Sequence, residues 1–355
     1  MTKSPASKWI LKFICFLLAM LLFLSAVAYI VDPFMQFRTK DNAYFLQEWY
    51  VSGGLIKNYD YDTLILGSSV TQNFNMDVFR QELGVKPLHV GLGAMTTVEL
   101  AELLNLAYET QKADTYYIGV DLPVLNGDKE ESRMPEHLIK NDFLSKMRYL
   151  LSYEVWFRYL PVDIAFMILD KLDVELPEKF VYQKSIDLLG DWRLDFPYSG
   201  EDHVLHHHRE GIFSVSLVET EGLYEGAVEC IDTFFEQCDF EKGEHIFFFP
   251  PYSSVCWVEY QLREQFEIYM QIKQYFIEKA LAYGVTVYDF QAADFTMDLN
   301  HYRDTIHYMP NINDWMVERF ADGDYVVTAE NRLQLEEKLT ENTNTFRARY
   351  PELFG

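Results

Sequence analysis

The sequence predicts an α/β protein, a parallel sheet in three layers, with a mainly helical insertion and a transmembrane helix at the N-terminus. Residues 13–31 form an apolar run without any charge. Short apolar, strand-like runs alternate with segments of helical period, first over residues 63–120 and again over residues 245–320. Between these blocks the alternation stops, and residues 125–238 are rich in aromatic residues and leucine. Strands alternating with helices favour a parallel sheet covered on both faces.

The N-terminal run is long enough to cross a membrane, since a helix of this length nearly spans a hydrocarbon layer about 30 Å thick. Lys3, Lys8 and Lys12 precede it and Asp32 follows it. This bias predicts a single-pass protein of the cell membrane, with a cytoplasmic N-terminus and an extracytoplasmic main domain. The alternative is a signal peptide cleaved after Ala26-Val27-Ala28. The apolar run continues to Val31, which favours retention.

The first strand-helix block has clear local signals. We expect strands over residues 63–66, 87–92 and 116–120. Asn75 is a candidate N-cap and Gly84 a candidate C-terminal stop for the helix between the first two strands. Thr96 and Glu99 have the spacing of a capping box ahead of a helix over residues 100–108.

The second block repeats the alternation. We expect a strand over residues 245–249, a long helix over residues 258–283 that Gly284 ends, a strand over residues 285–290, and helices over residues 313–320 and 330–347. Residues 147–172 of the insertion are almost continuously helical in pattern. The predicted organisation is a cytoplasmic basic leader (1–12), a transmembrane helix (13–31), a juxtamembrane stretch (32–59), the α/β domain (60–323, with the insertion at about 125–238) and a C-terminal helical extension (324–355).

Composition excludes some classes of function. The hydrophobic content of 49% supports a substantial core, and a net charge of −25 argues against nucleic acid as a partner. The four cysteines, Cys15, Cys230, Cys238 and Cys256, lack the spacing of a zinc site. We expect no structural metal, and a disulfide between Cys238 and either Cys230 or Cys256 is the less favoured alternative.

Two short segments carry the residue types of nucleophilic catalysis. Gly67-Ser68-Ser69-Val70 follows the first strand, where an exposed serine hydroxyl and an amide near a helix N-terminus would suit an oxyanion. Asp304-Thr305-Ile306-His307 supplies a base and a carboxylate to orient it. Both segments follow strands of one parallel sheet, so we expect them to meet at one edge. The alternatives are a capping turn at the serines and a surface turn at Asp304 and His307.

These segments resemble the SGNH, or GDSL-like, hydrolase superfamily, over residues 60–320 apart from the insertion. The resemblance implies a flavodoxin-like sheet, Ser69 as nucleophile, Asp304 as orienting acid and His307 as base, with Ser68 in place of the usual aspartate. The second motif of the family matches Gly91-Leu92-Gly93-Ala94, which implies that Gly93, in preference to Gly91, donates to the oxyanion together with the Ser69 amide. The third motif departs: Gly119-Val120-Asp121 lacks the usual asparagine, and Asn126 is the candidate replacement donor.

Val31-Asp32-Pro33-Phe34 and Pro250-Pro251-Tyr252-Ser253-Ser254 are similar to segments of membrane-anchored bacterial members. That resemblance implies an esterase or O-acyltransferase acting on a cell-surface polysaccharide or teichoic acid, a possible membrane protein as acyl donor, and no cofactor. The alternative is an inactive scaffold or binding module in the assembly of a cell-envelope polymer.

Two other features leave alternatives open. A metal site at His203, His206, His207 and His208 is less favoured because adjacent histidines point in different directions and lack companion ligands. A metal site at His301, Asp304 and His307 is less favoured than nucleophile-base chemistry, which also explains Ser69. The aromatic stripe from Tyr149 to Phe166 suits core packing, a substrate lid or contact with a bilayer.

Overall fold

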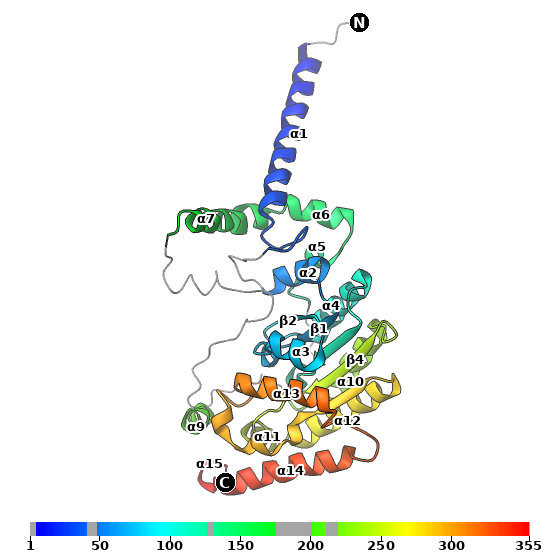
Figure 1. The fold of residues 1–355 in the computed structure, drawn as a ribbon, viewed down its shortest axis with the longest axis vertical. Coiled ribbons are helices and arrows are strands. Elements are labelled where there is room, and N and C mark those ends of the chain that lie inside the picture. The colour runs from blue at the N-terminus through cyan, green and yellow to red at the C-terminus, as the bar shows by residue number, and fades with distance from the viewer. Residues whose placement is uncertain (1–4, 41–47, 126–130, 175–199, 211–218, 355) are drawn as a thin grey trace. The chain divides into compact units, whose positions relative to one another are not determined.

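The computed structural model describes residues 5–40, 48–125, 131–174, 200–210 and 219–354. Its internal contacts divide the chain into two compact units (Figure 1). Unit 1 comprises Met1–Tyr59 and Met134–Leu188, and unit 2 comprises Asp60–Arg133 and Leu189–Gly355. The segment expected to form one insertion is therefore shared between the two units.

Unit 2 is built on a five-stranded sheet. Its strands are β1 (Thr63–Gly67), β2 (Pro87–Gly91), β3 (Thr115–Gly119), β4 (Glu244–Phe249) and β5 (Thr286–Asp289). The order is β2-β1-β3-β4-β5, and every adjacent pair is parallel. This is the flavodoxin-like order, in which the switch point between β1 and β3 opens a crevice at the carboxyl ends of the strands. The predicted fold class is confirmed.

Helices cover both faces of this sheet. One layer contains α3 (Met76–Leu83) and α13 (Pro310–Asp322), and the other contains α4 (Thr97–Thr110), α10 (Leu223–Gln237) and α12 (Phe266–Ala282). Neighbouring residues of β4 point to opposite layers: Phe247 packs against Phe235 and Phe276, whereas Phe248 packs against Phe320. Since α10 already belongs to a covering layer, the α/β arrangement resumes before β4. The remaining helices of unit 2 are α9 (Glu201–Arg209), α11 (Ser254–Leu262), α14 (Arg332–Arg349) and α15 (Pro351–Phe354).

Local signals placed several helix ends correctly. The Asn75 side chain accepts from the Asp77 amide, Gly84 ends α3 with a φ of 69°, and Thr96 and Glu99 form the predicted capping box of α4. The single helix expected over residues 258–283 is wrong. It is two helices, α11 and α12, because the chain turns at Glu264, whose φ is 60°.

Unit 1 contains α1 (Pro5–Val31), α2 (Glu48–Asn58), α5 (Glu136–Ile139), α6 (Phe143–Leu150), a π-helical turn η3 (Val155–Tyr159) and α7 (Leu160–Lys171). The nearly continuous helix expected over residues 147–172 is interrupted between α6 and η3. With a mean hydropathy of 2.8 in its most apolar window, α1 is long and apolar enough to cross a membrane. The core of the unit joins the end of α1 to the aromatic stripe: Ala28, Val31 and Phe34 pack with Tyr149 and Tyr159.

Candidate active site

Ser69 lies in the turn that follows β1. It begins a short 3-10 segment, η1 (Ser69–Thr71), in which the Thr71 hydroxyl donates to the Ser68 carbonyl over 2.9 Å. Gly67 is required here because a Cβ at this position would lie 2.4 Å from the Thr71 methyl group. Helix α3 begins at Met76, after the predicted N-cap Asn75, so the Ser69 amide belongs to η1 and does not lie at the N-terminus of α3 as expected. Oxyanion stabilisation at this turn therefore depends on individual amide groups.

The structure brings Ser69, His307 and Asp304 together in one hydrogen-bonded chain. Ser69 Oγ lies 2.8 Å from His307 Nε2, and His307 Nδ1 lies 2.7 Å from Asp304 Oδ2. Asp304 Oδ1 accepts the backbone N–H groups of Ile306 and His307 over 2.9 and 2.8 Å. Burial would raise the pKa of Asp304, but its contacts with His307 and these amides lower it to about 2. The carboxylate is thus ionised and holds Nδ1 protonated, which leaves Nε2 as acceptor for the serine proton.

The loop that carries Asp304 and His307 is held by residues that follow β4. Ser253 donates to the Thr305 carbonyl through its amide (3.1 Å) and its hydroxyl (2.7 Å). The Tyr302 hydroxyl donates to the Pro251 carbonyl over 2.8 Å. On the other side of the loop, the Tyr308 hydroxyl donates to the Val70 carbonyl over 2.6 Å, which joins the loop directly to the serine turn. The mutual position of base and nucleophile is therefore set by buried hydrogen bonds.

A second network lies beside the first. The Ser68 hydroxyl donates to Asp121 Oδ2 over 2.6 Å, and the Tyr252 hydroxyl donates to Asp121 Oδ1. Asp121 is buried at the carboxyl end of β3, and burial raises its pKa despite these two donors. The side chain of Asp121 accepts a hydrogen bond from each of these two hydroxyls, and, unlike an asparagine side chain, it has no N–H group that could donate to an oxyanion. The departure in the third motif thus gives Asp121 the role of a support for the serine turn, and sequence reasoning had missed this role and that of Tyr252.

Gly93 lies in a turn that is hydrogen-bonded to the end of β1. The Leu92 amide donates to the Gly67 carbonyl over 3.0 Å, and the Met95 amide closes the turn on the Leu92 carbonyl over 3.1 Å. Ala94, at the third position of this turn, has a φ of 48°, a conformation that costs about 1–2 kcal/mol for a residue with a Cβ. Gly91 remains paired with Gly67 inside the sheet. The predicted preference for Gly93 over Gly91 stays a prediction, and Asn126 lies outside the described residues.

Arg133 clamps this turn. Its guanidinium donates to the carbonyls of Gly93 (3.0 Å) and Ala94 (2.7 Å) and forms two further bonds, of 2.8 and 2.6 Å, to the two carboxylate oxygens of Glu99. Glu99 is fully buried and also caps α4. Because a peptide is planar, holding the two carbonyls also fixes the directions of the amides of Ala94 and Met95. The capping-box spacing identified Glu99, but no sequence signal linked Arg133 to it.

The histidine-rich segment forms α9. The rings of His203 and His207 are 4.2 Å apart, whereas His208 lies 3.0 Å from the buried carboxylate of Glu259. Burial and the neighbouring His203 lower the pKa of His207, although Asp304 opposes this shift, so α9 lies within electrostatic reach of the loop that carries Asp304. Within the described ranges, no three His, Cys, Asp or Glu side chains are grouped as metal ligands. All four cysteines are free thiols, so neither alternative disulfide is formed.

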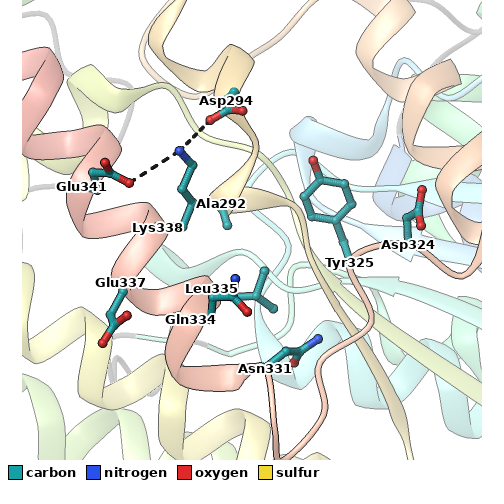
Figure 2. Close-up of a pocket in the computed structure, with 10 residues that line it drawn as sticks. All are labelled: Ala292, Asp294, Asp324, Tyr325, Asn331, Gln334, Leu335, Glu337, Lys338 and Glu341. Atoms are coloured by element: carbon teal, nitrogen blue, oxygen red, sulfur yellow. Dashed lines mark ion pairs between the residues drawn. The ribbon is translucent and has the colours of Figure 1, made fainter.

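Two cavities in unit 2 were compared with the positions of Ser69, Asp304 and His307. A cavity of about 20 Å³, with room for one water, lies behind the serine turn and is lined by Ser68, Asp121 and Met95 among others. A larger cavity of about 700 Å³ lies between α14 and the segment after β5 (Figure 2). Lys338 of α14 pairs with Asp294 of the segment after β5 (2.9 Å) and, within α14, with Glu341 (3.6 Å) (Figure 2). None of the three candidate catalytic residues lines either cavity.

Comparisons with known proteins give little beyond this geometry. No protein-family model matches the chain, and no curated protein matches it. Among solved structures, the chain is similar to an acetyl xylan esterase, with 9% sequence identity and a TM-score of 0.36. That match covers 74% of this chain and 99% of the esterase.

Proposed function

We propose that this protein is a serine-dependent esterase or O-acyltransferase that works through an acyl-enzyme on Ser69. The observation that carries the proposal is the continuous chain Ser69–His307–Asp304, with links of 2.8 and 2.7 Å. Such a chain supplies a nucleophile, a general base and a group that stabilises the charged base.

The reaction follows from these three groups. Ser69 Oγ attacks the acyl carbonyl while its proton passes to His307 Nε2, and Asp304 stabilises the imidazolium. The amides of Ser69 and Gly93 donate to the oxyanion. When the tetrahedral intermediate collapses, the ester C–O bond breaks, His307 returns the proton to the departing alcohol, and the acyl group stays on Ser69. A second hydroxyl then attacks the acyl carbon while His307 takes its proton; the ester bond to Ser69 breaks, and His307 returns the proton to Ser69 Oγ. Water as the second hydroxyl gives an esterase, and a glycan hydroxyl gives a transferase.

The proposed substrate is a cell-surface polysaccharide or teichoic acid. Support comes from α1, which as a membrane anchor with a cytoplasmic N-terminus would display unit 2 beside the cell envelope. The similarity of its sequence motifs to membrane-anchored SGNH members points to the same substrates. A membrane protein that delivers acyl groups would be the natural partner of the transferase.

The test is covalent labelling of the full-length protein, in detergent micelles, with a fluorophosphonate probe. We expect labelling of the wild type, and none of Ser69→Ala or His307→Ala. Ser68→Ala is the matched control: it removes the neighbouring hydroxyl, which donates to Asp121, and should retain the label. Labelling that persists in Ser69→Ala would refute Ser69 as nucleophile. A folded wild type that takes no label would favour the inactive scaffold.

A further inference from the structure

The segment from α6 to α7 is apolar on two sides. Its inward side chains Tyr149, Val155, Tyr159 and Leu160 belong to the core of unit 1. Other large apolar side chains are exposed: Phe143 (79%), Leu144, Leu151, Tyr153 (75%), Phe157 (72%), Ile168 and Leu172. An exposed apolar patch of this kind marks a binding surface.

The segment from α6 to α7 is attached to the C-terminal end of α1 and to the residues that follow it. Ala28 and Val31, in the last turn of α1, pack against α6, η3 and α7. Asp32, the next residue, accepts the Tyr149 hydroxyl over 2.9 Å, and Lys40 pairs with Asp163 of α7 over 3.1 Å. Figure 1 shows α6 and α7 running across the C-terminal end of α1. If α1 spans a membrane, this segment lies at the membrane surface where α1 emerges.

The exposed residues suit that surface chemically. The rings of Tyr153 and Phe157 lie together, with centroids 4.8 Å apart. Lys146, Arg148 and Arg158 accompany them, and Glu154 is the only acidic residue between positions 143 and 160. This local excess of positive charge contrasts with the net charge of −25 for the chain. Aromatic rings with flanking arginine and lysine are favoured where acyl chains meet anionic headgroups.

We propose that residues 143–158, which comprise α6 and most of η3, are a second membrane contact. They would lie in the bilayer interface with their exposed aromatic side chains among the lipids and their basic side chains at anionic headgroups. The proposal rests on α1 as a membrane span and is independent of chemistry at Ser69. The contact would hold the start of unit 1 against the membrane, where a polymer attached to that membrane begins.

The first experiment uses the full-length wild-type protein in vesicles of phosphatidylcholine and phosphatidylglycerol that contain a lipid with a photoactivatable acyl chain. After illumination, labelled peptides are mapped by mass spectrometry. We expect label in α1 and also in residues 143–158. Label confined to α1, with residues 143–158 unlabelled, would overturn the proposal and favour a protein partner for this surface.

A matched pair of variants sharpens the test. Tyr153→Glu combined with Phe157→Glu changes two side chains that are more than 70% exposed, so the core of unit 1 is left intact. We expect label in residues 143–158 to fall several-fold while label in α1 persists. The control Leu333→Glu makes the same kind of change at a leucine of α14 that is 63% exposed, and should leave the pattern unchanged. Equal labelling of the double variant and the wild type would contradict interfacial contact by these rings.

Discussion

Two neighbouring serines follow β1, and they belong to different networks. The Ser69 hydroxyl lies 2.8 Å from Nε2 of the His307 imidazole, a nitrogen that can accept its proton. The Ser68 hydroxyl donates to Asp121, whose other oxygen is occupied by the Tyr252 hydroxyl. One residue along the chain thus separates a hydroxyl poised to lose a proton from a hydroxyl used as a fixed donor.

The two buried carboxylates behind these serines differ in the same way. Asp304 is surrounded by groups that favour its charged form, and its pKa is lowered to about 2. Asp121 has two neutral hydroxyl donors, and burial outweighs them and raises its pKa. A carboxylate activates a serine through an imidazole that can carry charge; hydrogen-bonded directly to the hydroxyl, it only holds that hydroxyl in place.

The largest expected effect is the difference in kcat between two variants in which a buried carboxylate is replaced by an amide, Asp304→Asn and Asp121→Asn. Asp304→Asn should lower kcat for an activated ester by about 10⁴-fold, because the wrong imidazole tautomer would face Ser69. Asp121→Asn should change kcat by less than about tenfold, which corresponds to roughly 1.4 kcal/mol in the barrier. Steady-state hydrolysis of a p-nitrophenyl ester measures both. A similar loss of kcat in the two variants would show that the networks act as one.

An intermediate effect is expected at the turn that holds Gly93. Arg133→Met removes the donors to the Gly93 and Ala94 carbonyls. The Ala94 peptide carries the Met95 amide, which donates to the Leu92 carbonyl, and the Leu92 peptide carries the Gly93 amide, so Arg133 acts on the proposed oxyanion donor indirectly. We expect kcat to fall by less than the about 10²-fold that loss of one oxyanion donor would cause, with KM nearly unchanged. Arg133→Lys should recover part of kcat.

Arg80→Met, which breaks an exposed pair with Asp77, is the matched control and should keep full activity. A rise in KM with kcat unchanged in Arg133→Met would instead assign Arg133 to substrate binding.

The smallest effect concerns stability in acid. The folded pKa of Asp304 is about 2, against 3.8 for an unperturbed aspartate, so its contribution to stability is present above about pH 4 and disappears as pH falls toward 2. This shift is worth about 2 kcal/mol. The contribution of Asp121 to stability has the opposite pH dependence: because burial raises its pKa, ionisation of Asp121 opposes folding as pH rises.

Denaturant unfolding of the wild type, Asp304→Asn and Asp121→Asn between pH 2 and pH 7 measures these two contributions to the unfolding free energy. We expect Asp304→Asn to lose part of the acid dependence of the unfolding free energy. An unchanged dependence would mean that the pKa of Asp304 is the same in the folded and the unfolded protein.

Local patterns in the sequence were sufficient for much of the fold. Apolar runs predicted all five strands, and residues such as Asn75, Gly84, Thr96 and Glu99 predicted helix ends, since these signals act over a few residues. The separation of α11 from α12 was not predictable, because a turn at a non-glycine residue such as Glu264 leaves no compositional signal. The division of the insertion between two units depends on long-range packing, which periodicity does not report.

For the candidate site, the sequence by itself determined the chemical groups, Ser69, Asp304 and His307, and their location after strands of one parallel sheet. Only the tertiary structure decided that the Ser69 hydroxyl lies within hydrogen-bonding distance of the imidazole, that Asp121 binds Ser68 and Tyr252, and that Arg133 holds the turn at Gly93. Each of these contacts joins residues far apart in the chain, within about 3 Å. Hydrogen bonds depend on such short distances and on direction, and these are set only when the packed sheet and loops bring the groups together.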